Sequence, residues 1–512
     1  MCGKKILTCY FVISQEGTFL FKLSHSTYNQ PPMNLATFVD PAANAYQQAR
    51  IAHWNEVARR QDSWQGMGGW YHRRLHEIYR FHVSPNQNIL EVGCAAGHLL
   101  ASLKPAHGVG IDFSDEMICR AKKNYTELEF VHADAHDLSQ IKEKFDVIIL
   151  SDLVNDLWDV QRVLEQLRPL STSHTRIILN FYSRLWQVPL SIARSLNLAA
   201  PTLFQNWLTR DDIKVLLRLS NLETVRLTRE ILWPLPLGEI ANRFLVRLWP
   251  FSELALSNFV IARALRPTPE RAEEPAVSVV VPARNESGNI RAIFERVPQM
   301  GRETELVFVE GHSRDDTYAA IEREMAAHPG IPSLLLRQTG IGKADAVRLG
   351  FAKAKGDVLM ILDADLTVPP EDLPRFYEAL VSGKGEFING VRLVYPMEKE
   401  AMRLLNFLGN KFFSVAFSWL LGQPIKDTLC GTKVLWRRDY EQIAANRSYF
   451  GDFDPFGDYD LIFGAAKLNR KIVDLPIRYR ERTYGSTNIS RWKHGLLLLR
   501  MVAFAARRIK FV

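Results

Sequence analysis

An eleven-residue segment between two apolar runs divides this chain into two folding units. Residues 266–276 read RPTPERAEEPA and contain three prolines and five charged residues. Because proline and dense charge prevent a packed helix or strand, this segment is predicted to be an interdomain linker. The length of 512 residues agrees with a division, since a single hydrophobic core stops growing at roughly 250–300 residues.

Strand-like apolar runs alternate with helical stretches on both sides of this linker. Upstream, the strand-like runs occupy residues 88–92, 108–111, 129–131, 145–150 and 176–180. Downstream, they occupy residues 277–281, 305–309 and 358–362. This alternation is typical of a parallel sheet covered by helices. The sequence therefore predicts an α/β chain with two Rossmann-like domains, at residues 34–265 and 277–490.

Composition and charge narrow the class of protein. Hydrophobic residues make up 47% of the chain and charged residues 23%, which is typical of globular domains. The five cysteines are scattered, without zinc-site spacing, so a reducing cytosol is expected. A formal charge of +8 favours anionic partners, and nucleic acid, acidic lipid or a phosphorylated substrate would all satisfy it. No nucleic-acid motif accompanies the charge, so no nucleic-acid partner is predicted.

The first 33 residues precede the predicted domains. Lys4 and Lys5 stand before a short apolar run at residues 6–13, as in a signal peptide, but Glu16 follows and no small-residue cleavage site is evident. Residues 1–33 are therefore predicted to be a disordered extension, with Met33 as an alternative start. No apolar run reaches the ~18–20 residues that a membrane span needs.

A glycine-containing turn at residues 88–97 is the first candidate site. The sequence NILEVGCAAG leads a strand through Gly93 and Gly97 into a helix, whose first amides can approach a polar ligand closely. Asp112 ends the second strand, where a carboxylate can accept hydrogen bonds from both ribose hydroxyls of an adenosine ligand. Asp134 follows the third strand, where it could accept a hydrogen bond from an adenine amino group.

With Glu91, this segment resembles class I S-adenosylmethionine-dependent methyltransferases over roughly residues 45–265. The resemblance implies that S-adenosylmethionine is bound by Glu91, Gly93, Gly97, Asp112 and Asp134. It also implies transfer of a methyl group to an acceptor that the sequence does not identify.

One position departs from the family's pattern. The family often has glycine where this chain has Ala95, and alanine is tolerated if the backbone there avoids positive φ. Candidate bases for the methyl acceptor are Asp152, Asp156 and His136. The alternative is a catalytically silent domain that binds S-adenosylmethionine or a partner.

A second turn follows the first strand after the linker. The run VSVVVPARNESGN at residues 277–289 is a buried strand with a polar turn, and it resembles the opening of family 2 glycosyltransferases. The resemblance implies a GT-A fold in which Pro282, Arg284 and Glu286 surround the nucleotide. Glu310 ends the next strand, where the family usually has paired aspartates, and is predicted to contact the base.

The strongest motif is LDADLTVPPE at residues 362–371. Carboxylates at positions i and i+2 leaving a strand lie on one face, so Asp363 and Asp365 can share a divalent cation. Alternatively, one takes the ribose and the other takes the metal. Hard oxygen ligands suit Mg²⁺ or Mn²⁺, which bridges the diphosphate of a UDP- or GDP-linked sugar and neutralises charge on the leaving nucleotide.

A glycine–lysine segment lies between these motifs. Residues 340–350, GIGKADAVRLG, resemble the family segment that opens a helix near the diphosphate. Lys343 and Arg348 are the candidate phosphate contacts.

Two arginines precede an apolar, aromatic helix at Leu404–Leu421. Guanidinium groups bind phosphate bidentately while such a helix lies in a membrane interface, so Arg392 and Arg403 suit a lipid phosphate. This order resembles the dolichyl- and polyprenyl-phosphate sugar transferases of family 2. Two further segments match that subgroup, and they place Asp427 at the catalytic site and Arg482 over the donor diphosphate.

The acceptor chemistry leaves two alternatives. A lipid phosphate is already ionised at neutral pH and needs only positioning and stabilisation of the leaving group. A hydroxyl acceptor needs a carboxylate base, for which Asp427, Asp458 and Asp460 are available. The catalytic prediction comprises Asp365, Asp427, Arg392 and Arg403.

Residues 491–512 carry six lysines or arginines and no acidic residue among apolar residues. A basic apolar segment too short to span is typical of an anchor on anionic lipid, and the alternative is a core helix with a basic end. The leading hypothesis is a bifunctional enzyme of cell-envelope biogenesis, peripheral on the cytoplasmic face of the membrane. The alternative is a glycosyltransferase that extends a cell-surface saccharide or glycolipid.

Overall fold

A computed structural model describes most of the chain. The described residues are 8–13, 19–24, 41–60, 68–195, 203–265, 274–392, 404–447, 459–477, 484 and 491–511. They form two compact units, Met1–Ala49 and Arg50–Val512.

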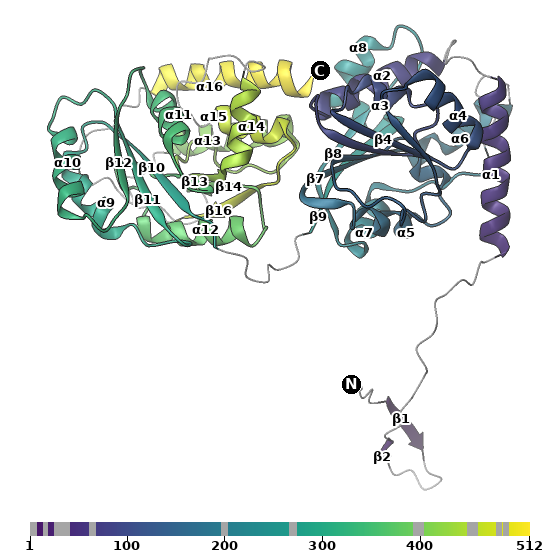
Figure 1. Ribbon diagram of the computed structural model, residues 1–512, viewed down its shortest axis with the longest axis horizontal. Coiled ribbons are helices and arrows are strands. Elements are labelled where there is room, and N and C mark those ends of the chain that lie inside the picture. Colours follow the sequence, from purple (N-terminus) through teal and green to yellow (C-terminus); the bar gives the residue numbers. More distant parts are fainter. Residues whose placement is uncertain are drawn as a thin grey trace. The chain divides into compact units, whose positions relative to one another are not determined.

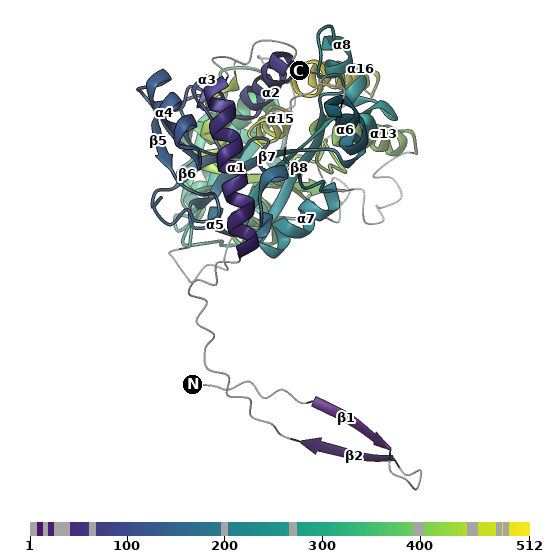
Figure 2. The ribbon, with the colours of Figure 1, turned by 90° about the vertical axis from the view of Figure 1, so that its right-hand side faces the viewer.

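The first unit contains a two-stranded hairpin (Figure 2). Strand β1 (Thr8–Ile13) pairs antiparallel with β2 (Phe19–Ser24), and Thr8 lies opposite Ser24. These two strands lie within residues 1–33, whose assignment as an extension before the domains stays a prediction. Their aromatic and β-branched side chains favour a pleated strand.

The second unit begins with a seven-stranded sheet of order β5-β4-β3-β6-β7-β9-β8. Its strands are β3 (Asn88–Val92), β4 (His107–Asp112), β5 (Glu129–His132), β6 (Phe145–Leu150), β7 (Ser171–Tyr182), β8 (Leu222–Glu230) and β9 (Ser257–Ala264). Only β9 runs antiparallel to its neighbours.

Helices cover both faces of this sheet (Figure 1). Alternating side chains of the strands pack against the two helical layers. On one face, Leu90 and Ile148 join α5 (Val160–Leu167) and α7 (Arg210–Leu219). On the other, Ile89 and Ile149 join the second layer. That layer comprises α2 (Gly68–His82), α3 (His98–Ser102) and α4 (Asp115–Asn124). The remaining helices of this half are α1 (Pro41–Arg60), η1 (Val154–Asp156), η2 (Arg184–Trp186), α6 (Gln187–Ser195), α8 (Glu239–Arg243), η3 (Leu245–Arg247) and η4 (Phe251–Leu254).

The second sheet has the order β12-β11-β10-β13-β15-β14-β16. Its strands are β10 (Val277–Ala283), β11 (Thr304–Glu310), β12 (Ser333–Arg337), β13 (Val358–Ile361), β14 (Phe387–Val391), β15 (Lys433–Trp436) and β16 (Ile472–Pro476). Here β15 runs antiparallel between β13 and β14, whereas the other pairs are parallel.

Helices cover both faces of this sheet as well (Figure 1). One face carries η5 (Ser287–Asn289), α9 (Ile290–Arg296), α10 (Thr317–Ala327), η6 (Pro370–Asp372) and α12 (Leu373–Val381). The other carries α11 (Lys343–Lys353), α13 (Leu404–Leu421), α14 (Arg437–Ala445), α15 (Tyr459–Lys467), α16 (Arg491–Ala505) and η8 (Ala506–Lys510). The predicted two-domain α/β layout is confirmed.

The basic C-terminal helix is packed into the second domain. Leu498, Met501 and Ala505 are buried in its core, whereas Leu496 and Leu499 are exposed on the outer face. The core-helix alternative therefore holds for one face of α16, whereas the anchor on anionic lipid stays a prediction for the exposed face. Within the described ranges, no helix has both the length and the apolar content needed to cross a bilayer.

Glu386, directly before β14, links the two sheets through buried charge. It is 3% exposed, and both its carboxylate oxygens accept hydrogen bonds from Arg176 Nη2 at 2.7 Å. Arg263 lies 3.4 Å away and Arg470 lies 3.7 Å away. Burial alone would raise the pKa of Glu386, but the arginine charges hold its pKa well below the usual range. The hydrophobic clusters of the two halves are separate, so this polar cluster connects them.

Replacing Glu386 with alanine should destabilise the full chain. The change leaves three buried guanidinium groups without their shared counter-charge, which costs about 3–5 kcal/mol. A lower midpoint of urea unfolding, with a smaller loss in Glu386→Gln, is expected. Because the folded pKa is depressed, the stabilisation is present above the unfolded pKa of about 4.3 and is lost as the pH falls below it. An unchanged midpoint at neutral pH would contradict the role of this cluster.

Candidate active sites

The glycine turn after β3 requires glycine at two positions. Gly93 has φ +76 and Gly97 has φ +78, in the left-handed region where residues with a Cβ are strained. A Cβ on Gly93 would lie 2.9 Å from Leu153 Cδ1, and one on Gly97 would lie 2.7 Å from Phe130 Cζ. Ala95 has φ +46, so the condition under which alanine would be tolerated at this position is not met. That conformation costs alanine on the order of 1 kcal/mol.

Two buried carboxylates hold this turn in place. Glu91 Oε2 accepts a hydrogen bond from the Leu100 amide at 3.0 Å, and burial raises the pKa of Glu91 to about 8. Asp112 accepts from the amides of Ala95 and Ser114, both at 2.9 Å, and burial raises its pKa as well. Glu91 therefore faces the start of α3, whereas Asp112 ties the end of β4 to the glycine turn.

Asp134 and His136 form a local pair after β5. Asp134 Oδ1 accepts from the His136 amide at 3.0 Å and lies 2.8 Å from its Nδ1. The Asp159 amide donates to His136 Nε2 at 3.2 Å, which places the ring proton on Nδ1. Burial would raise the pKa of Asp134, but the hydrogen bonds from His136 lower it. His136, a candidate base, thus has both ring nitrogens engaged.

The two other candidate bases differ in their surroundings. Asp152 Oδ1 accepts from Tyr71 Oη at 2.8 Å and from Asn180 Nδ2 at 2.5 Å, and burial raises the pKa of Asp152 to about 6. Asp156 accepts from Trp54 Nε1 at 3.3 Å and lies 3.8 Å from Arg50 Nη2. Asp152 is therefore the better placed of the three to exchange a proton near neutral pH.

The four predicted nucleotide contacts lie near the carboxyl ends of β10 and β11. Glu286 is buried, its amide donates to Thr317 Oγ1 at 2.9 Å, and its Oε2 accepts from Asn289 Nδ2 at 2.8 Å. Glu310 Oε1 accepts from the Ser313 amide at 2.5 Å. Pro282 lies within β10, and Arg284, directly after that strand, is exposed. These residues form one edge, because carboxyl ends of parallel strands lie together.

The aspartate pair after β13 is held by two different partners. Lys343 Nζ, at the start of α11, lies 2.6 Å from Asp363 Oδ1. Asp365 Oδ1 accepts from the Thr367 amide at 3.1 Å and from its hydroxyl at 2.8 Å. Burial would raise the pKa of Asp363, but the charge of Lys343 lowers it. The two carboxylates fit a hard divalent cation, and the lysine on Asp363 makes Asp365 the stronger candidate ligand.

Gly431, which the sequence analysis did not single out, packs against this pair. A Cβ at Gly431 would overlap Asp363 Oδ2 and Lys343 Nζ. Lys433 is fully buried beside it, and its Nζ donates to the Cys430 carbonyl. The sequence does not show that Gly431 packs against the predicted metal motif. This contact follows from the position of the loop before β15 in the fold.

Arg392 and Asp427 form a bidentate ion pair. Arg392 Nε donates to Oδ2 of Asp427 at 2.7 Å, and Nη2 donates to Oδ1 at 2.9 Å. Asp427 is 1% exposed; burial would raise its pKa, but Arg392 holds the pKa below the usual value. A carboxylate paired in this way is a poor general base and instead orients the guanidinium.

Two other predicted residues pair with each other. Arg348 Nη2 lies 3.3 Å from Asp460 Oδ2, which also accepts from Arg447 Nε at 3.0 Å. Arg348 is thus directed to a carboxylate of α15, which disfavours the predicted phosphate contact.

Asn389 and Asp474 were also missed by the sequence analysis. They lie opposite each other on β14 and β16, and Asn389 Nδ2 donates to Asp474 Oδ1 at 2.7 Å and to the Asp427 carbonyl at 2.9 Å. Single polar residues in short strands form no recognisable sequence motif. Asn389 and Asp474 are identified as part of the site only by their hydrogen bond in the fold.

Arg403, Arg482 and Asp458 lie outside the described residues. Tyr484, which the structure describes, has its Oη 3.1 Å from Ser287 Oγ, and a Cβ on Gly288 would lie 2.7 Å from Tyr484 Cδ2. Tyr484 therefore lies against the turn that follows β10.

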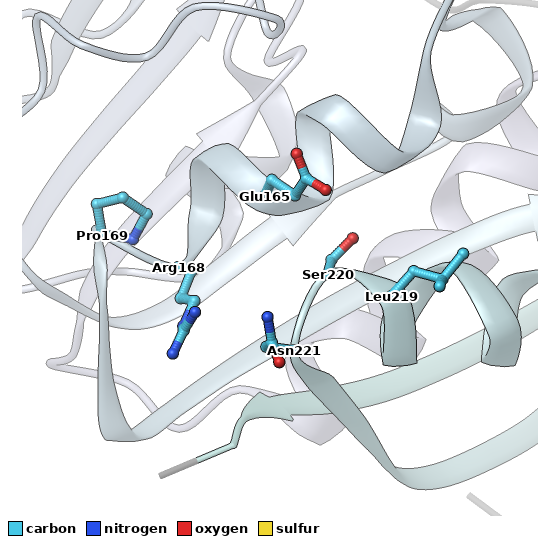
Figure 3. A pocket seen from close by; sticks show the side chains of 6 residues that line it. All are labelled: Glu165, Arg168, Pro169, Leu219, Ser220 and Asn221. Carbon is cyan, nitrogen blue, oxygen red and sulfur yellow. The ribbon is translucent and has the colours of Figure 1, made fainter. Parts of the chain in front are cut away.

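A surface hollow of about 570 Å³ lies elsewhere (Figure 3). It is lined by Glu165, Arg168, Pro169, Leu219, Ser220 and Asn221. These residues lie at the amino ends of β7 and β8, on the opposite edge of the sheet from Gly93 and Asp112. None of the predicted site residues lines this hollow.

Two family models match the chain. The model for glycosyl transferase family 2 matches residues 278–443, and a methyltransferase domain model matches residues 83–213. The described folds of the two regions agree with these matches.

Curated relatives match part of the chain. Undecaprenyl-phosphate 4-deoxy-4-formamido-L-arabinose transferase of Edwardsiella ictaluri is 28% identical over 232 residues, covering 44% of this chain and 64% of that protein. Dolichol-phosphate mannosyltransferase of Saccharomyces cerevisiae is 38% identical over 109 residues, covering 20% of this chain and 40% of that protein. The chain thus spans less than two thirds of either relative. Glucosyl-3-phosphoglycerate synthase from Mycobacterium tuberculosis is 17% identical, with 46% of this chain and 80% of that chain covered, at a TM-score of 0.33.

Gly431→Ala should weaken binding of nucleoside diphosphates. The added methyl group must displace Asp363 or Lys343, so the ion pair beside the predicted metal site is lost. Loss of charged hydrogen bonds worth about 1.5–3 kcal/mol predicts affinity lower by roughly tenfold or more. Calorimetry with UDP and with GDP, each with Mn²⁺, measures the change. Gly330→Ala is the matched control, because a Cβ there meets nothing within 4 Å. The packing argument is wrong if Gly431→Ala and the wild type bind the same nucleotide with equal affinity.

Proposed function

Because the chain combines a family 2 glycosyltransferase domain with a methyltransferase domain, we propose that it is a bifunctional transferase. Its C-terminal domain transfers a sugar from a UDP- or GDP-linked donor to a polyprenyl-type lipid phosphate. Its N-terminal domain transfers a methyl group from S-adenosylmethionine. The observation that carries the choice of sugar acceptor is the bidentate pair of Arg392 and Asp427.

A hydroxyl acceptor and a lipid phosphate differ in their need for a base. A hydroxyl acceptor must lose a proton, so it needs a carboxylate that can accept one. Of the three candidate bases, the structure describes two: Asp427 is paired with Arg392, and Asp460 is paired with Arg348 and Arg447. A lipid phosphate is already ionised and needs no base, so arginine-paired carboxylates do not impede its attack. The two relatives named above act, by their names, on undecaprenyl phosphate and dolichol phosphate, which supports the same choice.

The donor site is proposed at the carboxyl ends of β10, β11 and β13. Pro282, Arg284, Glu286 and Glu310 border the nucleotide, and Lys343 lies beside the diphosphate at the start of α11. The amides of that helix start and the lysine both favour an anion. When bound, Mg²⁺ or Mn²⁺ held by Asp365 and Asp363 would neutralise charge on the leaving diphosphate.

The acceptor phosphate is proposed to meet Arg392. Asp427 fixes the plane and position of that guanidinium, so little motion is needed when the phosphate arrives. Arg403 is the second proposed contact, and Arg482 is proposed to close over the donor diphosphate. The proposed location is the cytoplasmic face of an anionic membrane, where the lipid phosphate is presented.

S-adenosylmethionine is proposed to bind at the glycine turn of the N-terminal domain. Gly93 and Gly97 allow close approach of the backbone, Asp112 takes the ribose, and Asp134 lies on the adenine side. Glu91 supports the helix start behind the turn.

Asp365→Asn should abolish sugar transfer while the fold survives. Asparagine keeps the shape but removes a hard anionic ligand, so a loss of roughly 100-fold or more is expected. Transfer of radiolabelled sugar to polyprenyl phosphate, with and without EDTA, measures this. Asp211→Asn is the control, because Asp211 is an exposed carboxylate of the other domain. Full activity in EDTA would overturn the metal-dependent mechanism, and metal-dependent donor hydrolysis without lipid product would move the acceptor to a saccharide hydroxyl.

Asp112→Ala should weaken binding of S-adenosylmethionine and leave sugar transfer nearly unchanged. Loss of hydrogen bonds to a charged group, worth about 1.5–3 kcal/mol, predicts roughly ten- to hundredfold lower affinity. Calorimetry with the full chain measures binding. Asp112→Asn is the companion variant, because it preserves the volume that supports the amides of Ala95 and Ser114. If Asp112→Ala binds S-adenosylmethionine as tightly as the wild type does, the ribose assignment is wrong.

A further inference from the structure

Large apolar side chains protrude from the connection between β8 and β9. Within residues 233–254, Leu237 is 97% exposed, Trp249 is 82% exposed and Ile240 is 71% exposed. Further exposed members of the set are Trp233, Leu235, Phe244, Leu248, Phe251 and Leu254. Nine exposed large apolar side chains within one connection of a globular protein point to an interaction surface.

This connection is anchored from beneath. Asn242 is buried, donates to the Trp233 carbonyl at 2.6 Å and accepts from the Trp233 amide at 2.7 Å. Arg247 Nη1 lies 2.5 Å from the buried Glu230 carboxylate, and Val246 is buried. These buried contacts fix the backbone of the connection. The apolar side chains are therefore held in exposed positions.

The surface borders the proposed methyl-transfer site. Strands β7 and β8 both end at the sheet edge that carries the glycine turn, since β6 and β7 are parallel and β8 runs parallel to β7. After β7, η2 and α6 expose Leu185, Val188 and Ile192. Trp186 Nε1 donates to the Leu254 carbonyl at 2.8 Å, which joins this stretch to the β8–β9 connection.

Contacts of Phe511 extend this surface to the second domain. The rings of Phe244 and Phe511 stack at 5.4 Å, and Arg243 Nε donates to the Phe511 carbonyl at 2.8 Å. Trp419 of α13 meets Phe511 at 5.8 Å, and Phe412 and Val415 of the same helix are exposed. The apolar surface therefore continues from the β8–β9 connection to α13.

Charge along these segments favours an anionic partner. Residues 184–195, 231–254, 404–421 and 496–511 contain nine lysines or arginines and two glutamates; of the nine, Arg247 pairs with the buried Glu230, and burial lowers the pKa of Lys510 to about 7. One of these glutamates, Glu253, lies 2.7 Å from Arg229 Nη1. Tryptophan, phenylalanine and leucine beside basic side chains are the composition of segments that lie in the interface of an anionic bilayer.

We propose that this surface, formed by residues 233–254, α6 and α13, docks on an anionic lipid bilayer, and that the methyl acceptor is a hydroxyl of a lipid in that bilayer. The second half of the proposal rests on the proposed methyltransferase activity, whereas the docking does not. In the transfer, the bond from methyl to the sulfonium sulfur breaks as the bond from methyl to oxygen forms. Sulfur keeps the electron pair and becomes a neutral thioether, and Asp152 takes the hydroxyl proton.

Docking is tested with the full chain and vesicles of phosphatidylcholine with or without phosphatidylglycerol. The double variant Leu237→Glu/Trp249→Glu should bind phosphatidylglycerol vesicles at least about tenfold more weakly than the wild type, because two anchors are lost and two like charges are added. Val215→Glu, a half-exposed apolar residue on α7, is the matched control and should bind like the wild type. Wild-type binding should fall in high salt.

Three results would overturn the docking. The first is a double variant that binds vesicles like the wild type, and the second is a wild type that ignores phosphatidylglycerol vesicles in low salt. The third is a double variant whose only change, in sedimentation velocity, is loss of self-association, which would make the surface an interface between copies. Both side chains are exposed, so an unchanged melting temperature confirms that the variant folds.

The acceptor is tested with labelled S-adenosylmethionine and separate lipid and aqueous extracts of the parent organism. Label in the lipid fraction is expected, and the double variant should reduce it while retaining affinity for S-adenosylmethionine. Label confined to the aqueous fraction refutes the lipid acceptor. No label in either fraction contradicts the proposed methyltransferase activity itself, and vesicle binding still decides the docking.

Discussion

Asp427 holds the guanidinium of Arg392 through two hydrogen bonds at a position that solvent hardly reaches. Separating these charges would leave one of them buried and uncompensated, at a cost of about 3–5 kcal/mol. The pair therefore keeps a cation fixed on the acceptor side and prevents Asp427 from accepting a proton. A site built in this way favours an acceptor that arrives already charged.

The neighbouring pair of Lys343 and Asp363 depends on the same loop. Gly431 lies against both charged groups, and Asn389 anchors the Asp427 backbone by a hydrogen bond to its carbonyl. The loop before β15 thus supports the donor side and the acceptor side together. Because β15 runs antiparallel between β13 and β14, it delivers this loop to the carboxyl ends of both strands.

The sequence predicts the central strands and the carboxylate motifs because buried parallel strands are continuous apolar runs that end in polar turns. It does not predict partners that are distant along the chain. Arg348 meets Asp460 on another helix, and Glu386 collects arginines from both domains. Nor does it predict the positive φ of Ala95, since glycine is the residue that usually marks such a conformation. Four-residue β15 is too short to show a pattern.

The central claim is that the C-terminal site requires a phosphate on its lipid acceptor. The most direct measurement compares polyprenyl phosphate with the polyprenol of equal length, in the presence of Mn²⁺ and radiolabelled donor. We predict that label enters the organic phase with polyprenyl phosphate and not with polyprenol. Equal transfer to the polyprenol would contradict the account, because the alcohol needs a base that the arginine-paired Asp427 and Asp460 do not supply.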